Sequence, residues 1–326
     1  MEIYNESRKY KITSQENWVK CGKCGTEFDL NKNDGCPLCG FGSKKNIQED
    51  KVKKEKSENK ILEYLSIPND LVLEPGKPLI DDETRSVGSW GMFNSFFPGK
   101  ATLRVLAHLM EETNQKYVRL SDLMNKMREV LQESELTKLR GFPNNTKKES
   151  SIGRLVYHFI RIFTEMGFFI VKTTDRDKED VWACNWEDIE ITLTKEGLEF
   201  AKIKNRVFDY NESNQVLTLE EKTWLIDYLK KIDREGYKEY SILKDVFEFL
   251  KEGHNGKDEL WNWFKNNENF RNYVKQWSRK ADDPEAFEKQ IENISTTFAA
   301  GKLALLRELG IVKNKRNDYT ILEELK

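Results

Sequence analysis

Apolar residues in the last two thirds of the chain recur with the spacing of amphipathic helices. The pattern i, i+3, i+4 is shared by four of them: Leu103, Val105, Leu106 and Leu109. Such spacing places side chains on one face of a helix. A shift of 120 residues without gaps brings the last three onto Leu225, Ile226 and Leu229. The chain therefore contains two copies of one helical unit.

The remainder of each copy follows the same plan. Three further pairs of segments match: 117–123 with 237–243, 165–172 with 308–313, and 181–184 with 319–322. We expect a first helix, a polar turn and then a second helix capped by serine, Ser121 or Ser241. A third helix ends at a glycine C-cap, Gly167 or Gly310, and an apolar strand follows. The last pair of segments, 181–184 and 319–322, is predicted to form the second strands.

Three helices followed by a two-stranded hairpin resemble the winged-helix variant of the helix-turn-helix. The resemblance covers about 99–206 and again about 217–326, and the segment 191–201 is similar to the strand-then-helix ending common in winged-helix regulators. The second copy departs from the pattern through an insertion at about 254–293. It holds six aromatic residues that we expect to pack inward from extra helices: Trp261, Trp263, Phe264, Phe270, Tyr273 and Trp277.

Four of the five cysteines lie close together near the N-terminus with the spacing C-x2-C-x11-C-x2-C: Cys21, Cys24, Cys36 and Cys39. Two such pairs place four thiolates around one tetrahedral zinc ion. Short strands are predicted at 18–20 and 27–30. Residues 16–42 resemble a zinc ribbon, a rubredoxin-like pair of knuckles. We considered a redox motif and an iron site, and the pattern favours one structural Zn2+ per chain without an open position for catalysis.

These observations predict a mainly α protein with small β-hairpins (α+β). The expected parts are a zinc ribbon (1–42), a charged linker with a Pro/Gly-rich arm (43–98), a first winged-helix domain (99–210) and a second one (211–326). No apolar run is long enough for a transmembrane helix, and the N-terminus lacks the apolar region of a secretory signal. We therefore expect a cytoplasmic protein without membrane contact.

Charged residues make up 34% of the chain, yet Lys+Arg 54 against Asp+Glu 56 leave a net charge of −2. This balance excludes a uniformly basic, histone-like protein. The charge is segregated, because residues 99–172 hold 13 Lys+Arg against 8 Asp+Glu, a local +5. Residues 173–210 hold 6 against 10, a local −4. The basic stretch includes the third helix of the first copy, so the near-neutral total does not exclude nucleic-acid binding.

The winged-helix resemblance implies that the third helix enters the major groove of double-stranded DNA and that the wing reaches the backbone. In the first copy we predict phosphate contacts from Arg140, Lys147 and Lys148, and base contacts from Arg154, His158 or Arg161. In the second copy the corresponding residues are Thr296, Thr297 and Lys302 on the helix, and Lys315 and Arg316 at the wing. A small-residue face there suits packing against another helix equally well.

Catalytic motifs are missing from the sequence. It has no P-loop and no GxGxxG, and its three histidines suggest no pairing with a nucleophile. We expect a non-enzymatic DNA-binding protein, either a sequence-specific regulator or the recognition component of a DNA-processing or defence assembly. The alternatives are a protein–protein adaptor, which would dock a partner through the zinc ribbon or the aromatic insertion, and an RNA-binding protein. The oligomeric state stays open.

Overall fold

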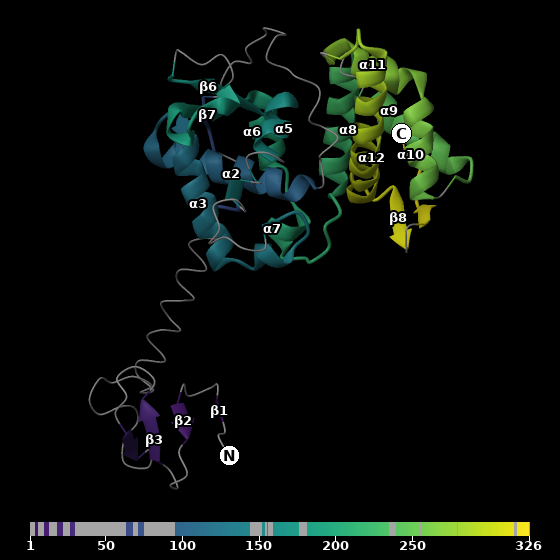
Figure 1. Ribbon diagram of the computed structural model, residues 1–326. Helices are drawn as coiled ribbons and strands as arrows, with labels where there is room; N and C mark the ends of the chain where they lie inside the picture. The colour runs from purple at the N-terminus through teal and green to yellow at the C-terminus, as the bar shows by residue number, and fades with distance from the viewer. Residues whose placement is uncertain are drawn as a thin grey trace. The chain divides into compact units, whose positions relative to one another are not determined.

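The protein, shown as a computed structural model in Figure 1, is mainly helical with small antiparallel sheets. Its internal contacts divide the chain into two units, Met1–Ile61 and Leu62–Lys326. The structure describes residues 4–5, 10–12, 18–21, 27–29, 63–67, 71–74, 95–143, 152–153, 155, 159–175, 181–234, 239–254, 256–278, 280–315 and 318–325.

The N-terminal unit contains an antiparallel sheet whose strands follow in chain order: β1 (Tyr4–Asn5), β2 (Tyr10–Ile12), β3 (Trp18–Cys21) and β4 (Glu27–Asp29). The two strands predicted around the first cysteine pair are confirmed, since Val19 is paired with Phe28. Phe28 is buried. The chain therefore reverses between Cys21 and Glu27. The charged linker predicted at 43–60 lies outside the described residues.

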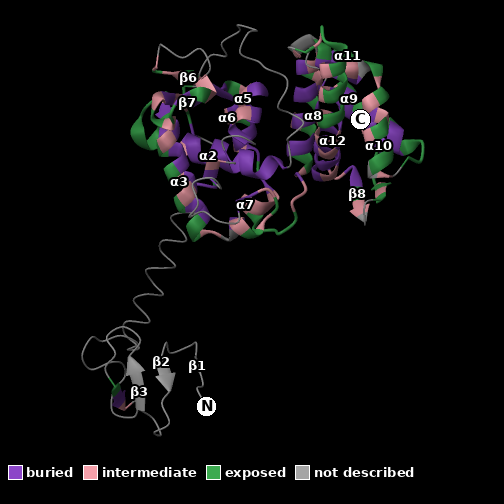
Figure 2. Ribbon diagram, viewed as in Figure 1, coloured by how far each residue is buried: buried purple, intermediate pink, exposed green. Residues whose placement is uncertain are grey.

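The second unit begins with what we call the first half, residues 95–210. Its helices and strands are α2 (Phe96–Thr113), β5 (Val118–Arg119), α3 (Leu120–Glu133), α5 (Arg161–Glu165), β6 (Phe169–Thr173), β7 (Ile189–Leu193), α6 (Lys195–Lys202) and α7 (Arg206–Tyr210), with 3-10 turns at η3 (Glu135–Lys138), η5 (Val181–Ala183) and η6 (Trp186–Asp188). The sheet order is β5-β7-β6, all antiparallel. Helix α2 is buried on every side from residue 96 to residue 107, so it is the central element (Figure 2).

The second half, residues 211–325, also places its helices ahead of an antiparallel hairpin, but its described sheet has two strands instead of three. Its elements are α8 (Leu219–Arg234), α9 (Glu239–Lys251), α10 (Lys257–Asn266), α11 (Glu268–Trp277), α12 (Pro284–Glu308), β8 (Val312–Lys315) and β9 (Asp318–Ile321). The predicted helical insertion is confirmed as α10 and α11. Of its six aromatic residues, Phe264, Phe270 and Tyr273 are buried, as expected, whereas Trp261 and Trp263 are only half-buried. The side chain of Trp277 lies outside the described part of the chain. The insertion ends earlier than predicted, because α12 already begins at Pro284 behind the N-cap Asp283.

The structure differs from the sequence-based prediction at one strand and at one helix end. The strand predicted at 181–184 is wrong: η5 occupies 181–183, and β6 pairs with β7 instead. Strand β7 forms instead because every second residue along it is apolar and buried, namely Ile189, Ile191 and Leu193. Helix α2 begins at Phe96 behind the N-cap Ser95, earlier than residue 100.

The predicted serine caps are also wrong, whereas the glycine C-caps are confirmed. Ser121 lies inside α3, whose N-cap residue is Arg119. In the second half the Asp233 carboxylate accepts hydrogen bonds from the backbone N–H groups of Tyr240 and Ser241 at 2.8 and 2.7 Å, and thus caps α9. Gly167 and Gly310 follow their helices with φ of 79° and 71°, a conformation that strongly favours glycine.

An arm ahead of α2 is fastened to the first half through its backbone carbonyl groups. Arg104 donates to the carbonyl of Leu65, and Lys202 donates to that of Leu71. His108 Nε2 lies 2.6 Å from the carbonyl oxygen of Ser66. Three basic side chains from α2 and α6 thus contact the backbone carbonyl oxygens of Leu65, Ser66 and Leu71.

Buried polar contacts join the two halves. Lys100 on α2 lies 2.5 Å from Glu221 on α8, and both side chains are almost fully buried. Glu221 also accepts from the backbone N–H of Thr218 and from the Asn205 amide. At the start of α2, the backbone N–H of Phe96 donates to Glu308 at 2.6 Å. The Glu308 side chain thus caps the first turn of α2 from the end of α12.

Aromatic rings complete the joint between the halves. Phe200 of the first half is stacked on Trp224 of α8 with ring centroids 5.2 Å apart, and Trp224 is in turn stacked on Tyr228 at 5.1 Å. Phe168 lies against Phe200 at 5.5 Å. The Tyr228 hydroxyl donates to the carbonyl of Met166. The ring contacts and the hydrogen bond together fix how α8 packs against the first half.

Glu308 gives the joint a dependence on pH. Burial raises the pKa of Glu308 to about 8, although the backbone N–H of Phe96 and the Ser95 hydroxyl oppose the rise. Arg307 also opposes it, and the nearby Glu221 adds to it. A folded-state pKa above the ordinary value means that folding takes up a proton. The stabilising contribution is therefore fully present below about pH 4.5 and is lost as pH rises to about 8.

We predict that the free energy of unfolding of the protein, relative to Glu308→Gln, falls between pH 5 and pH 8 by at most about 1.4 kcal/mol per pH unit. Above pH 8 the difference should stay constant. Urea unfolding at one-unit pH intervals measures it, and the Gln variant serves as the non-titrating control. A difference that is flat from pH 5 to pH 8 would contradict the burial of an ionisable group at this position.

Candidate nucleic-acid interface

The helix expected to read DNA in the first half ends in α5. The described residues 152, 153, 155 and 161–165 are helical, and the chain between them includes a π-helical turn at 159–160. The spacing i, i+4, i+7 and i+11 predicts an apolar stripe on this helix, and the structure confirms it, because all four members are buried: Leu155, Phe159, Ile162 and Met166. Because these apolar residues are buried, this side of the helix faces the core. The opposite side is the one on which the predicted base contacts would lie.

Two of the six predicted contact residues in the first half are described. Arg161 on α5 is half-buried, and its Nε lies 3.5 Å from the carboxylate of Glu165 one turn later. Arg140 is exposed in the loop after η3. Its backbone N–H and carbonyl both bond the Gln215 amide at 3.0 Å, which fixes the loop against the second half. The other four residues lie outside the described ones: Lys147, Lys148, Arg154 and His158.

The outer face of the β5-β7-β6 sheet carries basic residues that the sequence analysis missed. Arg119 on β5 and Lys172 on β6 both lie opposite Glu190 of β7, and both are exposed. Lys172 Nζ is 2.7 Å from Glu190 and 3.8 Å from the centre of the Tyr117 ring. The signal was present in the sequence, because Lys172 interrupts the apolar strand at an outward position. Arg119, Lys172 and Glu190 together carry a net charge of +1 on this face of the sheet.

In the second half, the described residues of α12 that were predicted to contact DNA are half-buried or buried. Thr296 and Thr297 are half-buried on α12, and the Thr296 hydroxyl donates to the carbonyl of Asn293 at 3.4 Å. Lys302 does not face solvent, which corrects the prediction for this residue: its side chain is 4% exposed and pairs with Glu239 of α9, which is 1% exposed. Arg316 and the side chain of Lys315 lie outside the described part of the chain.

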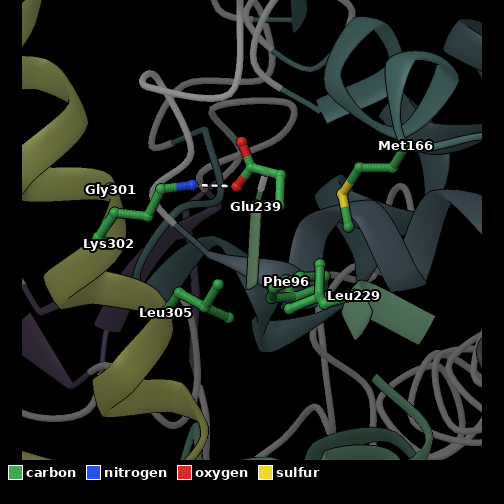
Figure 3. A pocket seen from close by; sticks show the side chains of 7 residues that line it. All are labelled: Phe96, Met166, Leu229, Glu239, Gly301, Lys302 and Leu305. Atoms are coloured by element: carbon green, nitrogen blue, oxygen red, sulfur yellow. Dashed lines mark hydrogen bonds and ion pairs between the residues drawn. The ribbon is translucent and has the colours of Figure 1, made fainter. Parts of the chain in front are cut away.

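Lys302 and Glu239 border a small cavity between the two halves (Figure 3). The cavity of about 10 Å³ is lined by Phe96, Met166, Leu229, Glu239, Gly301, Lys302 and Leu305. Glu239 Oε1 is buried and has no hydrogen-bond partner, while the other oxygen faces Lys302. Burial raises the pKa of Glu239, and the ammonium group of Lys302 opposes the rise. The space holds about one water molecule, so it is no substrate pocket.

The metal site predicted in the N-terminal unit is described only at its first residue. Cys21 ends β3, and β4 begins at Glu27. Cys24, Cys36 and Cys39 lie outside the described residues. Among the residues that are described, no group of three or more His, Cys, Asp or Glu is arranged to hold a metal ion. Cys184, the fifth cysteine, is a buried thiol in the first half.

Comparisons with known proteins identify no relative, so any functional proposal for this chain depends on its sequence and structure. No protein-family model, no curated protein and no solved structure matches this chain. No helix in the described part of the chain is both long and apolar enough to cross a membrane.

The Glu239–Lys302 pair gives a prediction about stability. Lys302→Met alone leaves a buried carboxylate without its cation, and we expect a loss of about 3–5 kcal/mol in the free energy of unfolding. The double variant Glu239→Leu/Lys302→Met removes both charges and should recover most of that loss. Urea unfolding of both variants and of Glu239→Leu completes the cycle. Additive losses in the double variant would show that the two side chains do not interact.

Proposed function

We propose that this chain is a non-enzymatic, cytoplasmic DNA-binding protein, built from a zinc ribbon followed by two winged-helix domains. The observation that carries the proposal is the order of elements in the first half. Helix α2, strand β5, helix α3, the helix that ends in α5 and the β6–β7 hairpin follow one another, with the sheet order β5-β7-β6. This order is the one expected of a winged helix, whose third helix reads the major groove.

The charge distribution supports the same proposal. Arg140 lies ahead of the third helix and Arg161 lies on it, whereas Lys172 lies near the loop end of the β6–β7 hairpin and Arg119 lies opposite Glu190. In the proposed complex, Arg140, Lys147 and Lys148 bind phosphate groups and position the protein. Arg154, His158 and Arg161 reach base edges from the third helix. The protein acts as a sequence-specific regulator or as the recognition component of a larger DNA-processing or defence assembly.

The proposal includes one structural zinc ion. Cys21, Cys24, Cys36 and Cys39 would hold it, and the ion would supply the folding energy that so small a unit lacks. The antiparallel pairing of β3 with β4 supports this, because it returns the chain directly after Cys21. A reducing cytoplasm keeps the four thiols available for zinc rather than for disulfides.

Salt dependence of binding tests the DNA proposal. We expect log K for random duplex DNA to fall steeply with log salt between 50 and 200 mM, because each phosphate contact releases counterions. The triple variant Lys147→Ala/Lys148→Ala/Arg154→Ala should flatten the slope by about two to three. The control Lys195→Ala/Lys204→Ala removes exposed lysines from the acidic stretch and should leave the slope unchanged. Absence of binding at 50 mM salt would refute the proposal.

Metal analysis of purified protein tests the zinc proposal. We expect about one zinc per chain, and Cys36→Ser/Cys39→Ser should lose the metal along with the fold of the N-terminal unit. Cys184→Ser is the matched control, since that thiol is buried in the other unit and should not alter the zinc content. Fewer than about one zinc per chain in the unaltered protein would overturn the assignment.

A further inference from the structure

Helix α12 precedes the hairpin of the second half, as the third helix precedes the hairpin of the first half. Residues 301–306 are all buried, so the helix has no open side over this stretch (Figure 2). A helix that reads bases must present one solvent-facing side to a groove about 12 Å wide. The C-terminal part of α12 presents none.

The first half supplies much of the cover. Phe96 from the start of α2 and Met166 from the end of α5 lie around the cavity opposite Gly301 and Leu305 of α12 (Figure 3). One turn further along, the carboxylate of Glu308 accepts the backbone N–H of Phe96 at 2.6 Å. The first half therefore covers the side of α12 that carries Gly301 and Leu305.

The N-terminal part of α12 is open to solvent, but its charges are balanced within the second half. Its exposed ionisable residues are Glu285, Glu288, Lys289 and Glu292. Glu288 pairs with Arg271, and Glu292 lies 2.9 Å from Lys265. These six residues together carry no net charge, so they give this side no positive excess to attract phosphate groups.

We propose that the chain binds duplex DNA through its first half alone, and that the second half is a brace whose α12 is closed to the duplex. This inference rests on the proposed function. It also explains why Lys302, which the sequence placed on a reading face, is turned inward to Glu239. The brace holds the loop of Arg140 through Gln215 and the end of α5 through the Tyr228 hydroxyl bond to Met166. The second half thereby positions the DNA-binding side of the first half without touching DNA.

The test compares two matched double variants on one 30-base-pair random duplex. Arg140→Ala/Arg161→Ala removes two positive charges from the first half, and Lys289→Ala/Lys313→Ala removes two exposed ones from the second. We expect the slope of log K against log salt to become less steep by about two in the first variant and to stay unchanged in the second. Lys147→Ala/Lys148→Ala provides a second first-half variant should the loss of Arg161 disturb folding, which circular dichroism checks.

Hydrogen exchange gives an independent readout on the unaltered protein. Amides of residues 301–306 should exchange slowly in the free protein and should not change when DNA is added, whereas peptides from 140–166 should gain protection. Equal flattening of the slope by both variants, or new protection in 284–300, would overturn the inference while leaving the proposed function standing. Absence of any salt-dependent binding by the unaltered protein would overturn both.

Discussion

The ion pair between Lys100 and Glu221 is the constraint on which the larger unit depends. Helix α2 is buried all round, yet it carries Lys100 and Arg104, and buried charges must be satisfied inside the fold. Lys100 bonds Glu221 and the carbonyl of Ile203, while Arg104 bonds Asp209 and the carbonyls of Ala201 and Ile203. Burial lowers the pKa of Lys100 to about 8, and Glu221 opposes the fall. Such pairs add little net stability but select one arrangement, which here is the docking of α6 and α8 onto α2.

The sequence predicts those helices and strands that depend on neighbouring residues in the chain, such as a run of apolar residues at helical spacing or a glycine at a helix end. Helical periodicity located α2, α3, α8 and α9, the glycines at 167 and 310 marked two helix ends, and the hairpin β8–β9 followed from its apolar alternation. The failures arose where a distant partner decides the outcome. Strand β7 is selected over 181–184 because it pairs with β5 and β6 at once. The α9 cap comes from Asp233, on the preceding helix.

The candidate site was also predictable where local spacing decides the outcome, and not where packing between helices does. The buried stripe of the third helix followed from spacing alone, and with it the side on which Arg161 lies. Lys302 was assigned to the wrong environment, because residue type and helical position do not reveal what covers a helix in the folded protein. A lysine on a helix is usually solvated. Only the packing of α12 against α9 shows that this one has a buried carboxylate as its partner.

The capping of α2 by Glu308 has a consequence for how the larger unit unfolds. The first turn of α2 lies near the beginning of the first half, whereas its carboxylate cap comes from the end of the last helix, 212 residues later. Lys100 likewise depends on Glu221 across the boundary between the halves. Separating the halves would remove the partner of the Lys100 ammonium group and of the Glu221 carboxylate, and would expose the aromatic faces of the joint to water. We therefore expect the two halves to unfold together rather than one at a time.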